Sequence, residues 1–218
     1  MRIDLHCHTD RYSFDASITP DDLVERARAV GLHGVCITEH DWFWDADDVL
    51  ALGRRHNFLV IPGAELNTEE GHILVYGVSG YDFAMHRAAF LKQEVQRASG
   101  AMVMAHPYRR QYSDDTGPWA TPYAEQLDKA AANPALRLAD GAEIFNGRGN
   151  PNQNRFSHDL CHRHGVPGAG GSDAHDLRDI GACATEFSRD VDGVASLVAE
   201  LRAGRFHPIV MRSAPTGE

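Results

Sequence analysis

The chain alternates short apolar runs, many of them β-branched, with longer stretches in which apolar residues recur every three or four positions. The short runs predict buried strands, and the longer stretches predict amphipathic helices. The predicted strands are residues 3–8, 34–38, 58–62, 73–76, 101–105, 142–145, 184–187 and 207–211. The predicted helices are residues 20–30, 45–56, 85–98, 123–132, 152–164 and 191–203. This alternation predicts an α/β fold with a parallel sheet, either a closed barrel or an open, doubly wound sheet.

Residue types that bind metal ions follow nearly every predicted strand at its C-terminal end: His6, His8, His40, Glu65, His106, Glu143, Asp173 and His175. His6 and His8 are two residues apart in one strand, so their rings point to the same face. An open sheet gathers ligands at one crevice between two strands, whereas a closed ring brings six strand ends to one centre. We therefore predict a barrel, with fewer than eight β/α units because the chain has 218 residues.

The composition limits the classes of partner and compartment. The formal net charge is -10, and the only lysines are Lys92 and Lys129. An acidic chain without a basic block does not favour a stable complex with long nucleic acid, although a short nucleotide held by metal ions is compatible with it. The four cysteines show no CxxC spacing and predict no disulfide framework. The N-terminus lacks a leader pattern and no apolar run is long enough to span a bilayer, so we expect a cytoplasmic protein that does not bind membranes. The oligomeric state stays open.

The candidate ligands at the strand ends and in the adjoining loops are His6, His8, Asp15, His40, Glu65, His72, His106, Asp173 and His175. This set is too large for one zinc ion and suits two to three divalent transition-metal ions, with Mn, Fe or Zn favoured by the mixture of imidazole and carboxylate. A carboxylate such as Glu65 can bridge two ions, which an imidazole cannot. Closely spaced ions lower the pKa of a water between them and neutralise charge on a phosphoryl group. Phosphorus is therefore the expected electrophile, and a carbonyl is the second choice.

The order of the segments DLHCHT, ITEHD, GAEL, GHILVYG, AHPYR and GSDAH resembles the PHP superfamily, which is named for bacterial DNA polymerases and histidinol phosphatases. Its small, free-standing metal-dependent phosphoesterases are the most similar branch, and the resemblance covers residues 3 to about 187. It implies a distorted (β/α)7 barrel with a trinuclear metal site at the C-terminal ends of the strands, and phosphoester hydrolysis. On this basis residues 1–212 form one barrel domain and residues 213–218 a disordered tail.

The resemblance also implies how the nine ligands divide among three ions. His6, His8, Glu65 and Asp173 hold the first ion. Glu65, His72 and His106 hold the second, with Glu65 as the bridge. Asp15, His40 and His175 hold the third. Glu65, Asp173 and His175 are the expected catalytic residues.

The chain departs from the usual pattern of the family at two positions. Some members carry histidine at the position of Asp15, which makes it the least secure ligand. Glu39 stands where the family usually has aspartate, in the sequence Thr38-Glu39-His40. Because Glu39 is one residue off the face of His40, we expect it to support the site rather than to bind metal. By the same resemblance, residues 143–147 line the substrate side of the pocket rather than the metals.

Substrate-binding candidates follow the strand-end motifs. Arginine suits bidentate phosphate recognition, which makes Arg109 and Arg148 candidates, together with Asn146. Arg148 is the preferred arginine, because the Asn146-Gly147 turn fixes its direction. A surface salt bridge or an ordinary turn explains each of these residues equally well.

The predicted function is that of a metal-dependent phosphoesterase, which hydrolyses a small phosphorylated substrate, a phosphomonoester or nucleotide, with a metal-activated hydroxide. Three alternatives stay open: a nuclease acting on the ends of short oligonucleotides, an amidohydrolase, and a metal-stabilised module without turnover. The complete ligand set argues against the last alternative, because decayed sites usually carry Asn, Gln or Ala at ligand positions.

Overall fold

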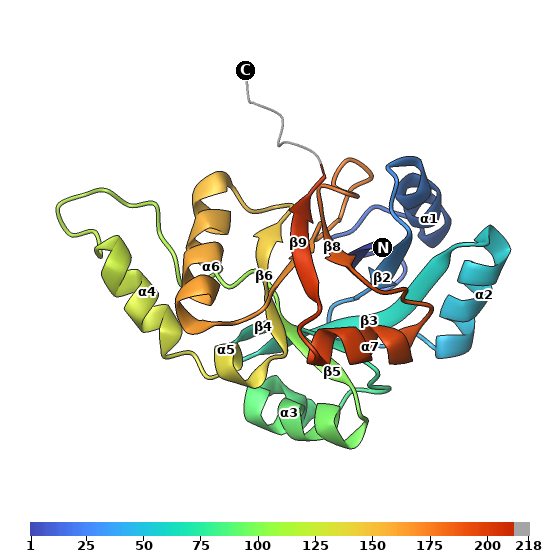
Figure 1. The fold of residues 1–218 in the computed structure, drawn as a ribbon, viewed down its shortest axis with the longest axis horizontal. Helices are drawn as coiled ribbons and strands as arrows, with labels where there is room; N and C mark the ends of the chain where they lie inside the picture. The colour runs from blue at the N-terminus through green and yellow to red at the C-terminus, as the bar shows by residue number, and fades with distance from the viewer. Residues whose placement is uncertain (212–218) are drawn as a thin grey trace.

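The protein is described by a computed structural model that covers residues 1–211 (Figure 1). Its strands are β1 (Arg2–Cys7), β2 (Gly34–Ile37), β3 (Leu59–Thr68), β4 (Gly71–Tyr76), β5 (Ala101–Met104), β6 (Gly141–Asn146), β7 (Gly168–Gly171), β8 (Cys183–Phe187) and β9 (Phe206–Val210). Its helices are α1 (Pro20–Ala29), α2 (Ala46–His56), the 3-10 helix η1 (Phe83–His86), α3 (Ala88–Arg97), α4 (Tyr123–Ala131), α5 (Ala135–Leu138), α6 (Pro151–His164) and α7 (Val194–Arg202). The predicted tail, residues 213–218, lies outside the described residues.

The strands form one sheet in the order β7-β6-β5-β4-β3-β2-β1-β8-β9. The sheet curls until its ends meet. The residue that follows β7 by three positions, Ala174, pairs in parallel with Cys7 at the end of β1. Backbone hydrogen bonds from His8 to Ala174 (3.0 Å) and from Ala174 to His6 (3.3 Å) make this closure. The strands β1 to β7 thus form a ring at this end, and the predicted distorted α/β barrel is confirmed.

Two further strands make the barrel irregular, so that residues 1–211 contain nine strands in place of seven. β8 pairs antiparallel with β1, and β9 pairs antiparallel with β8. The Thr185 hydroxyl on β8 bonds the Gly170 backbone on β7 from both sides, accepting from its N–H at 2.9 Å and donating to its carbonyl at 2.8 Å. β8 and β9 therefore fill the gap between β1 and β7 at the end of the barrel opposite the Cys7–Ala174 closure.

Apolar residues fill the barrel and also the space between the sheet and the helices. The interior cluster includes Ile3, Leu5, Ile61, Leu74 and Tyr76, from β1, β3 and β4. A second cluster packs the sheet against α3, α4 and α6, and a third packs it against α1 and α2. Figure 1 shows α1 and α2 on one side of the sheet and α4 and α6 on the opposite side. Among the described residues, no helix is both long enough and apolar enough to cross a membrane.

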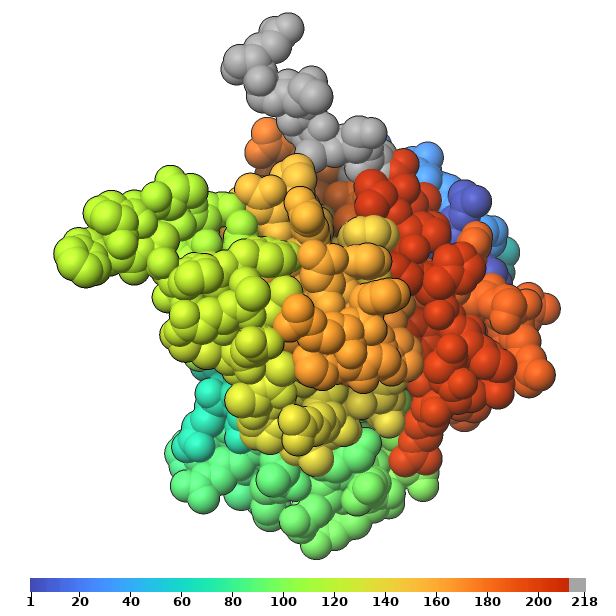
Figure 2. Space-filling model, turned by 60° about the vertical axis from the view of Figure 1, so that its left-hand side comes forward, coloured from blue at the N-terminus to red at the C-terminus, as the bar shows by residue number. Residues whose placement is uncertain are grey.

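The structure differs from the predicted elements mainly at β3. This strand runs to Thr68, six residues beyond the predicted end at Pro62, because it forms a hairpin with β4. Glu65 therefore lies inside a strand and not in a loop after it. The predicted helix 85–98 is divided into η1 and α3, since Arg87 is extended and begins a new helix. The segment before α4 is a long loop, as predicted, and projects from the body of the molecule (Figures 1 and 2).

Two β-bulges set which side chains face the barrel interior. One lies between Asp4 and Cys7 of β1, and the other lies between Glu143 and Phe145 of β6. Each bulge inserts one extra residue and so shifts the alternation of the side chains after it. On β1, Leu5 faces the interior but Cys7 packs under α1 and α2, which leaves His6 and His8 to face the interior at the strand end.

The interior also contains a hydrogen bond that spans the barrel. The Tyr76 hydroxyl on β4 donates to the Leu5 carbonyl on β1 at 2.7 Å, next to His6, and the ring is fully buried. We expect Tyr76→Phe to lower the free energy of unfolding by about 1 kcal/mol, because a buried carbonyl loses its donor. Urea unfolding measures this change. Tyr81→Phe, at a ring that is 44% exposed, is the control, and equal midpoints for the two variants would contradict the expectation.

Candidate metal centre

All nine predicted ligands lie together at the end of the barrel where the parallel strands finish. Four sets of three have ligand atoms within 4.8 Å of one another: His6–His8–Glu65, His6–His106–Asp173, Glu65–His72–His106 and His8–His40–His175. Glu65 contributes to two of these sets and His6 to two. The sets therefore share members and form one continuous centre.

The first group is fully buried. His6 and His8 present their Nε2 atoms to Glu65 Oε2 at 3.3 and 3.4 Å, and each lies 3.5 Å from Asp173 Oδ1. Among the described residues, the two Nε2 atoms are buried without a hydrogen-bond partner, and the buried Glu65 Oε2 has His40 Nδ1 at 2.9 Å. Burying a polar atom without a hydrogen bond costs free energy unless a ligand such as a metal ion binds it. Two imidazole nitrogens and carboxylate oxygens around one point are a donor set that fits a divalent transition metal.

The second group shares Glu65. Its other oxygen, Oε1, lies 2.8 Å from His72 Nδ1 and 2.9 Å from His106 Nε2. The two oxygens of one carboxylate thus face two different sets of imidazoles, His72 and His106 at Oε1, and His6, His8 and His40 at Oε2, where His40 Nδ1 lies at 2.9 Å. This is the arrangement that the predicted bridging role of Glu65 requires.

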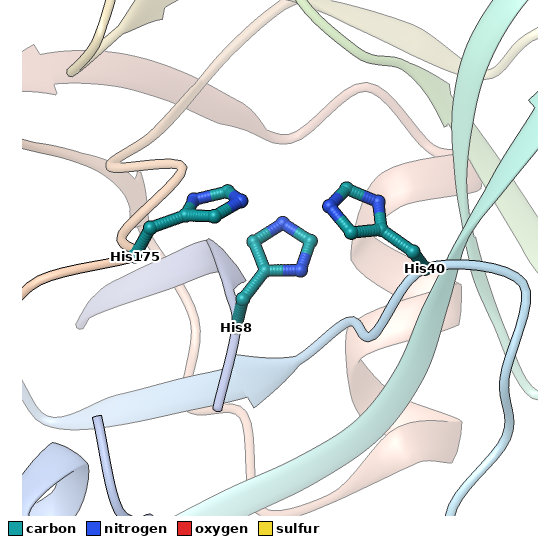
Figure 3. Close-up of side chains that lie close together, drawn as sticks. All are labelled: His8, His40 and His175. Atoms are coloured by element: carbon teal, nitrogen blue, oxygen red, sulfur yellow. The ribbon is translucent and has the colours of Figure 1, made fainter. Parts of the chain in front are cut away.

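The third group lies nearer the solvent. Figure 3 shows the rings of His40 and His175 directed towards His8, which comes from the end of β1. The ring centroids of His40 and His175 are 4.2 and 4.3 Å from that of His8. Asp15 joins them through contacts of 3.5 Å to His40 Nε2 and 3.2 Å to His175 Nε2, and its side chain is 61% exposed. The structure therefore brings Asp15 to the centre but leaves it at the rim.

Negative charge dominates the electrostatics of the centre. Burial opposes the charged form of His6, yet Glu143, Asp173 and Glu65 together raise its pKa well above the ordinary value. Burial also opposes ionisation of Glu65, but His6 and neighbouring imidazoles hold its pKa well below the usual range. Burial lowers the pKa of His8 to about 4, so this ring is neutral at neutral pH. The centre thus gathers ionised carboxylates, a neutral imidazole at His8 and an imidazole at His6 that holds a proton in place of a cation.

Glu143 has a role that the sequence did not reveal. It lies against the metal side of the pocket, and not along the substrate side as the resemblance implied. It is fully buried, and one oxygen lies 3.0 Å from His6 Nδ1 while the other accepts the His106 backbone N–H at 3.0 Å. A carboxylate on the far nitrogen of a ligand histidine fixes the ring and leaves the near nitrogen free for a metal. Glu143 comes before the bulge in β6 and faces inward by ordinary alternation, because its neighbours Ala142 and Ile144 pack against the helices.

Asn146 occupies a supporting position. Its amide donates to Glu143 Oε2 at 3.0 Å and to Asp173 Oδ2 at 3.3 Å, and the residue is fully buried. Its carbonyl oxygen accepts the Tyr108 hydroxyl and the Arg148 backbone N–H. The polar atoms of the Asn146 side chain therefore make hydrogen bonds within the protein, and the amide group connects two carboxylates of the centre.

The two candidate arginines are placed differently. Arg109 directs its guanidinium over the centre, with Nη2 3.7 Å from Asp173 Oδ2, and its side chain is 41% exposed. Arg148 is exposed and touches the network through its backbone. Beyond Arg109, the long loop borders a surface cavity of about 440 Å³ that none of the nine ligands lines. The geometry favours Arg109 over Arg148.

The backbone at the centre is strained. Asp173 has a φ of 54° and His106 a φ of 27°, in the left-handed region that side chains with a Cβ rarely adopt. The neighbouring Gly171 has no room for a side chain, because a Cβ there would lie 2.3 Å from Glu143 Oε1 and 2.7 Å from the His6 Cβ. Strain of this kind concentrates at functional sites, where the surrounding structure holds it in place.

A sequence model of the PHP domain matches residues 4–133, more than half of the chain, and a model described as PHP-associated matches residues 151–206. The chain belongs to the PHP family. A DNA polymerase III of the PolC type from Oceanobacillus iheyensis is 33% identical to this PHP protein over 76 residues. That match covers 34% of this chain and only 5% of the polymerase.

Solved structures share the fold of this PHP protein. One is a two-domain protein of Bacteroides vulgatus described as containing a predicted PHP-like metal-dependent phosphoesterase, with a TM-score of 0.67, 18% identity, and coverage of 96% of this chain and 64% of that one. An amidohydrolase of Chromobacterium violaceum, solved with sulfate and no metal, has a TM-score of 0.63, 15% identity, and coverage of 98% and 99%. PsfC of Pseudomonas syringae has a TM-score of 0.62, 18% identity, and coverage of 96% and 91%. At these identities the likeness concerns the fold alone.

The shared carboxylate of this PHP protein can be tested through metal content. We expect the wild type, reconstituted with Zn, Mn or Fe, to hold two to three ions per chain. Glu65→Gln should lose at least one ion and the activity while staying folded, because an amide neither bridges two cations nor neutralises their charge. Elemental analysis measures the ion content, and circular dichroism reports whether the variant is folded. Glu69→Gln, at an exposed glutamate of the same hairpin, is the control. One ion or none in the wild type would contradict the assignment.

Proposed function

We propose that this PHP protein is a metal-dependent phosphoesterase that acts on a small phosphorylated substrate. The observation that carries the proposal is the pair of buried atoms without a hydrogen-bond partner among the described residues, His6 Nε2 and His8 Nε2, which face Glu65 Oε2 at the centre of nine converging ligands. His6, His8, Glu65 and Asp173 hold one ion, Glu65, His72 and His106 hold a second, and Asp15, His40 and His175 are the outer ligands. When bound, such ions supply Lewis acidity and lower the pKa of water to near neutrality.

Two of the three expected catalytic residues act as fixed negative charges. His6 and its neighbours hold the pKa values of Glu65 and Asp173 well below the usual range, although burial opposes this. Carboxylates with such low pKa values do not exchange protons near neutral pH. Glu65 and Asp173 therefore bind and orient, and the proton that a departing alcohol needs comes from elsewhere.

His175 is the expected catalytic residue best placed to move that proton. Its Nε2 lies 3.2 Å from Asp15 Oδ2, at the edge of the centre that opens to solvent. The outer group thus has two uses in the proposal. It completes a third ion site, or, when only the two inner sites are filled, His175 Nε2 donates its proton to the leaving oxygen while the Asp173 carbonyl, 2.9 Å from Nδ1, orients the ring.

Arg109 binds the phosphate in this proposal. Its guanidinium already reaches Asp173, so a phosphate entering the centre meets it at once. A guanidinium offers two parallel N–H donors to phosphate oxygens and keeps its charge at all working pH values. Arg109 therefore holds the substrate in place without taking part in metal binding.

Exposed aromatic rings favour a nucleotide among the small phosphorylated substrates. Phe14 is fully exposed and precedes Asp15, and Trp42 is 50% exposed and follows His40 by two residues. Trp42 also stacks on Tyr12 with centroids 5.0 Å apart. Rings at the entrance can stack on a planar base. This observation keeps short oligonucleotide ends as the second candidate substrate.

A substrate panel tests the proposed reaction. We expect the metal-loaded protein to release phosphate from phosphomonoesters, with mononucleotides preferred over sugar phosphates, and to lose this activity with excess chelator. The panel includes phosphodiesters, short oligonucleotides and amides, since one relative of the same fold is named an amidohydrolase. Hydrolysis of amides alone would overturn the proposal, and cleavage of oligonucleotide ends alone would favour the nuclease alternative.

Kinetics of arginine variants test how the substrate is held. Arg109→Ala should lower kcat/KM without loss of metal. The decrease should correspond to a loss of about 1.5–3 kcal/mol of transition-state stabilisation, the range for a hydrogen bond to a charged group. Arg148→Ala should change it by less than about 1 kcal/mol, as expected for an exposed charge. Arg110→Ala, at the exposed arginine next to Arg109, is the control. Equal effects of Arg109→Ala and Arg110→Ala would remove Arg109 from the binding site.

A further inference from the structure

Glu39 is a fully buried carboxylate beside the metal centre, and all its partners are hydrogen-bond donors. Its Oε2 accepts the Thr9 backbone N–H at 3.1 Å and the Ser13 hydroxyl at 2.5 Å. Its Oε1 accepts the Trp44 indole N–H at 3.1 Å and the Thr9 hydroxyl. Each oxygen thus faces one N–H that can only donate, so Glu39 acts as an acceptor throughout. The residue follows β2 and binds the loop that follows β1.

Ser13 connects this carboxylate to a metal ligand. Its hydroxyl has a single proton, which it donates to Glu39. The Ser13 oxygen also lies 3.4 Å from the His40 backbone N–H and 3.2 Å from His8 Nδ1. Because the serine proton is already used, His8 Nδ1 must supply the proton of the last hydrogen bond. A neutral imidazole with a proton on Nδ1 has its lone pair on Nε2.

The direction of that lone pair decides what His8 can bind. His8 Nε2 is buried, has no hydrogen-bond partner, and lies 3.4 Å from Glu65 Oε2 and 3.5 Å from Asp173 Oδ1. The opposite tautomer would place a proton at this point and block the approach of a cation. For His6 the equivalent support is direct, since Glu143 lies 3.0 Å from its Nδ1. Among residues 1–211, no carboxylate contacts His8 Nδ1. The Ser13 hydroxyl lies between this nitrogen and the carboxylate of Glu39.

We propose that Glu39 and Ser13 are positioning residues that hold His8 as the Nδ1–H tautomer and aim its Nε2 lone pair at the metal centre. The same serine also binds the backbone of His40, so one hydroxyl ties a ligand of the inner group to a ligand of the outer group. The inference rests on the metal centre of the proposed function, and it is independent of the substrate.

The tautomer can be observed directly by ¹⁵N NMR of the full chain labelled at histidine, first without metal and then titrated with Zn²⁺. The His8 signal is assigned by its absence in His8→Asn. We expect the wild type to show the Nδ1–H tautomer and to bind Zn²⁺ through His8 Nε2. In Glu39→Gln the new amide N–H competes for the Ser13 oxygen and frees the serine proton to point at His8. The Nε2–H form should then gain population.

Metal affinity provides a second readout, measured by competition with a chromophoric chelator. Glu39→Gln and Ser13→Ala should weaken Zn²⁺ binding by about 10–100-fold, as loss of an outer hydrogen-bond partner typically does. Ser157→Ala is the matched control, because Ser157 is equally buried but its hydroxyl has no hydrogen-bond partner among the described residues. It should leave the tautomer and the affinity unchanged.

Two results would overturn the inference: an Nε2–H tautomer of His8 in the wild type, or wild-type tautomer and affinity in folded Glu39→Gln and Ser13→Ala. The wild-type spectrum decides the first point even where a variant fails to fold, which circular dichroism reports. Neither readout uses a substrate. Failure here is therefore distinct from failure of the proposed phosphoesterase activity.

Discussion

Buried negative charge is the constraint on which the rest of this structure depends. Five carboxylates are at most 1% exposed around one end of the barrel: Asp4, Glu39, Glu65, Glu143 and Asp173. No lysine or arginine is buried among residues 1–211, and Arg109, which approaches Asp173, is partly in solvent. Burying charges without partners is expensive. The metal-free protein offsets this cost with a proton on His6, whose pKa the carboxylates raise. Divalent ions supply the same positive charge more fully, so metal binding and the stability of this end of the barrel are coupled.

The barrel meets this constraint through its irregular features. The hairpin of β3 and β4 keeps Glu65 inside a strand, where backbone pairing with Leu74 holds it rigidly. The bulge in β1 turns His6 towards Glu143, and the bulge in β6 turns Asn146 towards the same carboxylate. Asp173 keeps a left-handed backbone, which costs on the order of 1–3 kcal/mol. In a regular barrel, the side chains at the strand ends would alternate strictly between the interior and the helices. Fewer ligands would then point towards the metal centre.

The sequence predicted what depends on local pattern and on strand order. Apolar periodicity located eight of the nine strands in residues 1–211 and most helices, but it missed β7, whose sequence Gly-Ala-Gly-Gly carries no apolar pattern. The polar residues after the strands indicated a closed ring, because an open sheet cannot gather so many ends. It could not predict the bulges, since an extra residue in one strand leaves no mark in its composition. Glu143 was expected at the pocket, but its contacts with His6 and the His106 backbone depend on how separate strands meet, which no local pattern shows. The sequence preference for Arg148 as the phosphate ligand stays untested; the structure adds only that the Arg109 guanidinium lies 3.7 Å from Asp173, a contact that depends on tertiary packing and not on the nearest turn.

Exposure varies across the centre, from buried ligands to a rim formed by His40 and Asp15, although His175 of the outer group is less exposed than His72 of the inner group. Glu65 and His106 are at most 2% exposed, whereas the side chains of His40 and Asp15 are 32% and 61% exposed. Inner ligands are held by packing and by Glu143, so an ion there meets preorganised donors and leaves slowly. Outer ligands are in contact with water, which competes for the ion and screens its charge. If ions fill both parts, as we propose, the outer position would be the one whose occupancy responds to metal concentration. Ser13 lies where the two parts join, bound to the His8 ring and to the His40 backbone. A shift of the outer loop on substrate binding would consequently be felt at the inner ligand through one hydroxyl.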